Sequence, residues 1–231
     1  MYRKKTDKDS EKINNLYLDV TYGKKPFTNY PYLHTKYLTE KFSIQKNSKL
    51  LDLGCGRGEF TKGFLDQGMD CYGVDQSDQA KKFCPAAKIK VANLEERLPF
   101  EDNCFDVIYS KSVLEHFYYP EKLLSEAYRV LKPNGLIISL TPDWAHNVIC
   151  FHEDFTHRTA FTSKSLDDIH KFCNFTNVET NKFIQLPFVW RMPYLKPLTD
   201  LIRIIAPYKL KTYSKLVRFS KEIMLITTAR K

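Results

Sequence analysis

The sequence has no long apolar run. Within its 231 residues, no stretch approaches the roughly 20 consecutive apolar residues that a helix needs to cross a bilayer. Residues 1–10 also lack the apolar stretch of a signal peptide. We therefore expect a cytoplasmic location.

Cysteine pairs at metal-binding spacing are missing as well. The chain has six cysteines, at positions 55, 71, 84, 104, 150 and 173, and no two of them form a C-x-x-C pair. The usual zinc-cluster spacings are therefore excluded, and a chain of this length and compartment gives no reason to expect a disulfide framework. We expect free thiols.

The charge that is present is unevenly distributed along a chain of net charge +9. Residues 1–49 carry 11 Lys and Arg against 5 Asp and Glu, residues 50–180 carry 14 against 20, and residues 181–231 carry 11 against 2. An acidic middle is thus flanked by two basic ends. Basic ends indicate an anionic partner or surface, although a solvated lysine-rich face explains the charge equally well.

Short apolar runs alternate with helix-like stretches from residue 49 onward. Each run is bounded by Gly, Asp, Asn or Pro, as strands are. The runs are 50–53, 71–75, 88–91, 105–109 and 136–140, and the helix-like stretches are 59–67, 76–83 and 121–131, the last closed by a turn at 132–135. This alternation predicts an α/β fold, a doubly wound parallel sheet with helices on both faces.

The two ends of the chain add further elements. Residues 10–20 and 32–42 have the pattern of amphipathic helices, and residues 178–186 and 222–229 that of strands. We expect an N-terminal helical cap over 1–48 and a core over 49–231. The core contains a basic, proline-punctuated insertion at about 187–220.

A glycine-rich turn follows the first predicted strand. Its spacing is Gly54-x-Gly56-x-Gly58, which differs from the G-x-G-x-x-G of most dinucleotide folds. Glycines at this place let the backbone approach a ligand closely. Asp75 closes the second predicted strand about 20 residues on, where an acid accepts hydrogen bonds from ribose hydroxyls. Together these features favour a nucleotide-like ligand.

These residues resemble the motifs of class I S-adenosylmethionine-dependent methyltransferases of the broad type 11 kind. The resemblance covers roughly residues 48–180, and the matching segments are 50–60, 72–75, 93–106, 110–116 and 129–135. Motifs in this order are specific for the fold and the cofactor, S-adenosyl-L-methionine, but not for the acceptor. The resemblance implies a Rossmann-like seven-stranded sheet of order 3-2-1-4-5-7-6, with the last strand antiparallel and supplied by residues 222–229.

The resemblance also implies a set of cofactor-binding residues. Those expected around the methionine part are Asp52, Gly54, Gly56, Gly58 and Ser110. Those expected around the ribose and the adenine are Asp75, Gln76, Asn93 and Leu94.

Catalytic residues are harder to predict, because the sulfonium donor is already activated and the protein mainly positions it and excludes water. A general base is needed only where the acceptor must lose a proton, as a hydroxyl does. The candidates near strand ends are His116, Asp143 and His157. Residues 154–166 resemble a loop and helix of methyltransferases that act on sugars and surface polysaccharides. This favours His157, since His116 could equally cap or pack a helix.

A metal site is not predicted. His152 and His157, with Glu153 and Asp154 between them, are all potential ligands, but their spacing matches no known site.

The basic C-terminal segment has two interpretations. Its aromatic and apolar residues, interleaved with lysine and arginine, could lie on an anionic membrane surface. Alternatively, the stripe Leu198, Leu201, Ile202 and Ile205 packs on the sheet edge as a lid, which the four prolines favour because they break a long interfacial helix.

The leading functional hypothesis is O-methylation of a small, anionic or phosphate-bearing acceptor, a sugar or a glycan or lipid-linked precursor. A nucleic-acid methyltransferase is the alternative that the basic charge suggests. No stable nucleic-acid complex is expected, since residues 109–112 lack the Asn/Asp-Pro-Pro-aromatic motif of base amino-group methylation. A non-catalytic cofactor-binding partner protein remains open, as does the oligomeric state.

Overall fold

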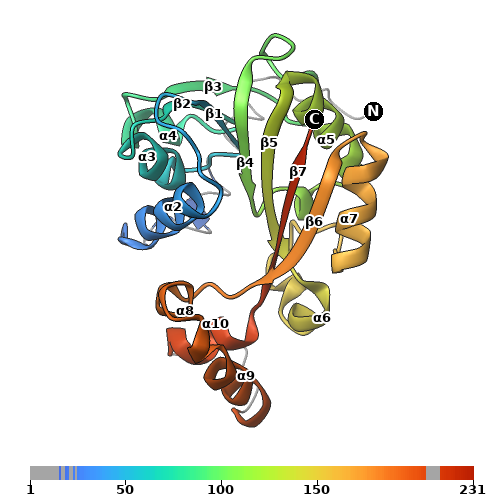
Figure 1. Cartoon of the computed structure of the whole chain (residues 1–231). Coiled ribbons are helices and arrows are strands. Elements are labelled where there is room, and N and C mark those ends of the chain that lie inside the picture. The colour runs from blue at the N-terminus through green and yellow to red at the C-terminus, as the bar shows by residue number, and fades with distance from the viewer. Residues whose placement is uncertain (1–15, 17–18, 21–22, 24, 207–213) are drawn as a thin grey trace.

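A seven-stranded sheet forms the centre of the computed structural model, which describes residues 16, 19, 20, 23, 25–206 and 214–231 (Figure 1). The strands are β1 (Lys49–Leu53), β2 (Asp70–Asp75), β3 (Lys88–Val91), β4 (Phe105–Lys111), β5 (Leu131–Pro142), β6 (Thr176–Phe183) and β7 (Met224–Arg230). The helices are α2 (Tyr30–Lys41), α3 (Glu59–Leu65), α4 (Gln79–Phe83), α5 (Pro120–Val130), α6 (Trp144–Asn147), α7 (Ser163–Phe172), α8 (Pro187–Arg191), α9 (Lys196–Ile205) and α10 (Lys215–Lys221).

The strand order is β3-β2-β1-β4-β5-β7-β6. Strands β1 to β5 pair in parallel, and β7 runs antiparallel to both β5 and β6. This is the Rossmann-like arrangement, and the predicted order and antiparallel last strand are confirmed.

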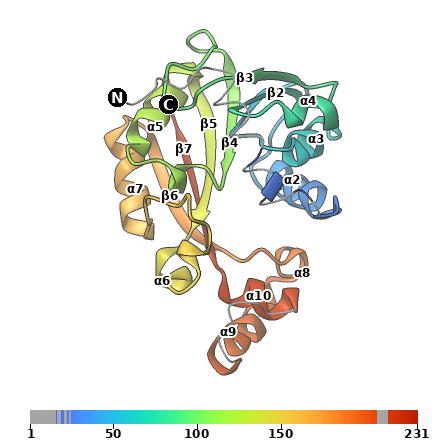
Figure 2. The same ribbon diagram turned by 180° about the vertical axis from the view of Figure 1, so that it is seen from behind.

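Strand β1 shows why the sheet is covered on both faces. Its side chains alternate between the faces, and its three leucines are buried, as in a central parallel strand. Leu50 packs in a cluster with Leu38 of α2 and Phe64 of α3. Leu51 packs in the opposite cluster, which includes Leu124 of α5. Each face therefore has its own helical layer (Figure 2).

The predicted boundaries differ from the observed ones around α5. The turn expected at 132–135 lies inside β5, which begins at Leu131 opposite Phe105. The pairing register shifts before Leu136, and Asn134 adopts a positive φ of 62°. The four residues thus form an irregularity in the strand rather than a separate turn. Most of the helix predicted at 10–20 lies outside the described residues.

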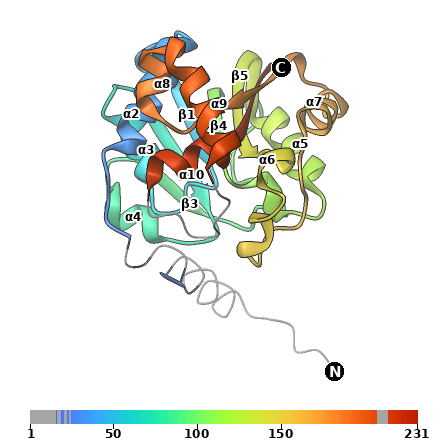
Figure 3. The same ribbon diagram turned by 90° about the horizontal axis from the view of Figure 1, so that it is seen from below.

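The insertion between β6 and β7 contains α8, α9 and α10 and lies beneath the carboxyl ends of the parallel strands (Figures 1 and 3). The expectation that the apolar stripe of α9 packs on the sheet edge is wrong. Leu198, Leu201 and Ile205 are 48%, 52% and 68% exposed. Helix α9 packs on α10 instead, and Val189 of α8 and Phe219 of α10 form a separate apolar cluster.

None of the helices in the described part of the chain combines the length and the apolar character that a membrane span requires.

Candidate functional site

A cavity of about 390 Å³ opens at the carboxyl ends of β1, β2 and β4. Strand β1 lies between β2 and β4, so this is the point where the strand order reverses and where open α/β sheets bind ligands. The volume is within the usual range of small-molecule sites. The lining residues are Gly54, Cys55, Gly56, Arg57, Glu59, Phe60, Asp75, Gln76, Leu94, Lys111, Ser112, Val113, His116, Phe117, Phe155 and Thr156.

The glycine loop forms one wall of this cavity. Gly54 has φ +78°, and a Cβ on it would lie 2.4 Å from Cγ2 of Val113. Gly56 has φ +51°, and a Cβ on it would meet nothing within 4 Å. The open space beside Gly56 is a cradle that fits a cofactor against the backbone. Gly58, also with positive φ, ends the loop at the start of α3 and does not line the cavity.

Asp75 holds the glycine loop from the end of β2. One carboxylate oxygen accepts a hydrogen bond from the Gly56 amide at 2.9 Å, and the other accepts one from the Ser77 amide at 2.9 Å. Burial raises the pKa of Asp75, and these hydrogen bonds oppose the shift. Asp75, Gln76 and Leu94 all line the cavity, as does Gly56.

Besides Gly58, three of the predicted cofactor residues do not line the cavity. Asp52 is buried behind the loop, where it accepts a 2.5 Å hydrogen bond from Oγ1 of Thr61, and burial raises its pKa to about 7. Ser110 is buried within β4. Asn93 is exposed, and its side-chain amide donates to Glu96.

The catalytic candidates separate into two groups. His116 lines the cavity. His157 packs against His116, and the centroids of the two rings are 4.8 Å apart. Burial lowers the pKa of His116 to about 4 and also lowers the pKa of His157. Asp143 instead caps α6 and bonds Nδ1 of His146 at 2.5 Å, outside the cavity lining. His152 is exposed on the loop.

Sequence reasoning missed Lys111, which ends β4 and lines the cavity. Its ammonium lies 5.5 Å from the centroid of the Phe60 ring, and burial lowers its pKa to about 8. The signal that could have found it is its position at a strand end directly after Ser110. Sequence reasoning also missed Glu115, which is buried beside His116 and His157.

Comparison with known proteins agrees with this geometry. Residues 51–139 match the family model described as a methyltransferase domain. An uncharacterised methyltransferase of Schizosaccharomyces pombe is 33% identical over 113 residues, which are 46% of this chain and 44% of that protein. The mitochondrial ubiquinone biosynthesis O-methyltransferase of Mus musculus is 32% identical over 104 residues, which are 40% of this chain and 28% of that protein.

A solved structure shares the fold over most of the chain. The S-adenosylmethionine-dependent methyltransferase from Archaeoglobus fulgidus has a TM-score of 0.64 at 22% identity, and the match covers 87% of this chain and 94% of that one. The present chain spans less than half of the length of the two curated relatives. The match over residues 51–139 identifies a methyltransferase domain of the type 11 kind within this chain, and the sheet has the fold of the class I S-adenosylmethionine-dependent methyltransferases. S-adenosylmethionine is the cofactor that these two findings support.

Proposed function

We propose that this chain transfers a methyl group from S-adenosylmethionine to a hydroxyl oxygen of a small anionic acceptor, a sugar or a lipid-linked glycan precursor. The observation that carries the proposal is the pair His116 and His157 beside the cavity, with His116 in its wall. A hydroxyl acceptor must lose its proton during transfer, and this pair is placed to activate it. The cofactor supplies the electrophilic methyl group.

We place the cofactor against the glycine loop. Gly54 and Gly56 would border its methionine part, Asp75 its ribose, and Gln76 and Leu94 its adenine. All five line the cavity, which supports this placement. For Gly58, Asp52, Ser110 and Asn93 we propose indirect support of the loop and the strand ends, consistent with their positions outside the lining.

Three cations that interact electrostatically with one another, two of them paired with Glu59 and Glu222, support an anionic acceptor. Arg57 lines the cavity. Burial lowers the pKa of Lys25, and the positive charges of Arg218 and Arg57 lower it further, so the three side chains lie near one another. Arg218 belongs to α10, so the insertion comes close to the glycine-loop side of the cavity. We therefore propose that the insertion, with the cap formed by residues 1–48, surrounds the acceptor side.

The face of α9 supports a lipid-linked acceptor. Tyr194, Leu198, Leu201 and Ile205 follow each other at helical spacing and are exposed, next to basic side chains of the same insertion such as exposed Lys196. An apolar stripe flanked by positive charge suits an anionic bilayer surface. We propose that this stripe contacts such a surface and brings the cavity to its acceptor.

The test is transfer of labelled methyl groups to a panel of sugar nucleotides and lipid-linked sugars, with hydroxyl and amine compounds that carry no sugar as comparison. We expect transfer to a phosphate-bearing sugar and its loss in His116→Ala. Transfer confined to acceptors without a sugar would overturn the acceptor class.

A further inference from the structure

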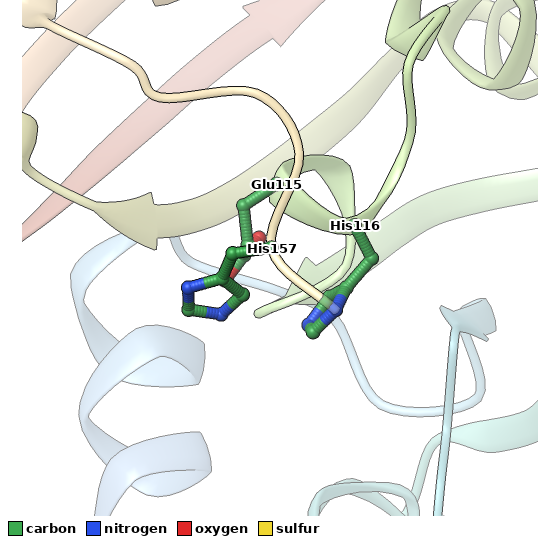
Figure 4. A group of neighbouring side chains, drawn as sticks. All are labelled: Glu115, His116 and His157. Carbon is green, nitrogen blue, oxygen red and sulfur yellow. The ribbon is translucent and has the colours of Figure 1, made fainter. Parts of the chain in front are cut away.

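Two histidines and a glutamate converge beside the cavity. Glu115 and His116 lie in the short helix that follows β4, Leu114–His116, and His157 lies on the loop after α6. One potential ligand atom from each residue lies within 4.8 Å of the others. Figure 4 shows the Glu115 carboxylate next to the His157 ring, with the His116 ring alongside. The three side chains come from positions up to 42 residues apart, so tertiary structure assembles the group.

The Glu115 carboxylate is fully buried. Among the described residues, neither of its oxygens has a hydrogen-bond partner of good geometry. Buried polar groups are normally paired, and a buried carboxylate without a partner is strongly unfavourable. The positive charge of Lys111 acts on this carboxylate, but no hydrogen bond joins the two side chains, so both carboxylate oxygens remain available to a ligand.

The hydrogen bonds of the two histidines determine which ring nitrogens are free of a proton. Oγ1 of Thr156 donates to Asp154 at 2.5 Å, so it accepts from Nδ1 of His116 at 2.8 Å. Nδ1 of His157 donates to the carbonyl oxygen of Phe151 at 2.6 Å. Each ring therefore carries its proton on Nδ1 and its lone pair on Nε2. Histidines that bind metals are oriented in this way, by a hydrogen bond from the other ring nitrogen.

We propose that Glu115, His116 and His157 form a binding site for a divalent transition-metal cation of the Zn²⁺ type. Two imidazoles and one carboxylate are the protein ligands of many zinc sites that keep an open coordination position. The same set is less suited to Mg²⁺, which prefers oxygen ligands. Because His116 lines the cavity, an ion held by these three residues would border it.

This inference rests on the proposed function and specifies how the acceptor is activated. A cation at this position would bind the acceptor oxygen as a Lewis acid and make its hydroxyl more acidic. The two histidines would then act as ligands rather than as the base, and the proton of the hydroxyl would pass to water as the methyl group moves from sulfur to oxygen.

The test is calorimetric titration of the full chain, stripped with a chelator, with ZnCl₂. We expect one ion per chain with a micromolar Kd, and at least 10-fold weaker binding in His157→Ala and in Glu115→Gln. His152→Ala is the matched control, because His152 is an exposed histidine on the same loop, and it should bind as the wild type does.

Cobalt absorption separates these ligands from the six cysteines. Co²⁺ bound at the proposed site should show d–d bands without a thiolate charge-transfer band. Absence of binding, a thiolate band, or equal affinity in the wild type and both ligand variants would overturn the proposal. His157 is only half-buried, so its alanine variant is expected to fold even where Glu115→Gln does not. Calorimetry needs no acceptor, so a negative result leaves the proposed methyl transfer standing, and a missing acceptor leaves the metal site testable.

Discussion

The two sides of the cavity are built in different ways. On the cofactor side, where we place S-adenosylmethionine, main-chain conformation defines the wall: Gly54 and Gly56 take positive φ, and Asp75 holds the loop through the Gly56 amide. On the opposite side, where we propose that the acceptor binds, side chains define the wall, and they come from distant segments such as His116 after β4 and Phe155 on the loop after α6. A backbone-built site tolerates few substitutions. A side-chain-built site can change its ligand by changing single residues.

The largest effect should come from Gly54→Val. A side chain there must adopt a φ of +78° and would place Cβ 2.4 Å from Cγ2 of Val113. Left-handed conformations are costly for a β-branched residue, and the clash distorts the loop. We expect the affinity for S-adenosylhomocysteine to fall by more than about 1,000-fold, which is about 4 kcal/mol. Calorimetry measures it.

Gly68→Val is the control for that substitution. Gly68 also has a positive φ, +90°, but a Cβ there would make only ordinary contacts with the Lys46 side chain, away from the cavity. It should lower the free energy of unfolding and leave cofactor affinity unchanged. Equal losses of affinity in both variants would mean that backbone strain in general, rather than the cavity wall, controls binding.

A second test uses pH on the cofactor side. The folded protein keeps the Asp52 proton up to about pH 7, while the unfolded chain releases it near pH 3.8, so the folded state binds more protons between these values. Its stability therefore falls as pH rises. Between pH 5 and pH 7 this group should remove about 2 kcal/mol of unfolding free energy. Asp52→Asn, which can still accept from Thr61, should flatten the dependence in urea titrations. An unchanged slope would contradict the buried, protonated state.

Features formed by residues close together in the sequence could be predicted, and features assembled from distant residues could not. Strand β1, the glycine loop and Asp75 lie within 27 residues, and their spacing alone predicts the loop after a buried strand. The seven-strand order came from the resemblance. Glu115 could not be assigned a role, because its importance depends on His157, 42 residues away, and on complete burial. For the stripe of α9 the sequence left two interpretations open, a membrane surface and the sheet edge, because the packing of α9 on α10 instead of the sheet is a tertiary outcome.

The acceptor side should respond to charge without affecting the cofactor side. Arg218→Ala removes one of the cations grouped around Lys25 and Arg57, so we expect the KM for an anionic acceptor to rise by about 10-fold, worth about 1.4 kcal/mol. The Kd of S-adenosylhomocysteine should stay the same. Lys215→Ala, an exposed residue of the same helix, is the control. A parallel change in both constants would show that α10 supports the glycine loop as well, and the two sides would no longer be independent.

The smallest effect, below 10-fold, is expected for the exposed face of α9. Replacing Leu198 and Leu201 by serine removes part of an apolar stripe that is about half exposed, so each side chain has only a fraction of its burial energy to gain on a membrane. Binding to vesicles rich in phosphatidylglycerol should weaken by about 5-fold in co-sedimentation, and added salt should weaken it further in the wild type. Phe172→Ser, at a side chain 75% exposed at the end of α7, is the matched control and should bind normally. Equal binding by the wild type and both variants would mean that the apolar stripe does not contribute and that lysines alone bind the vesicle. Equal binding to neutral and anionic vesicles would mean that electrostatic attraction does not contribute.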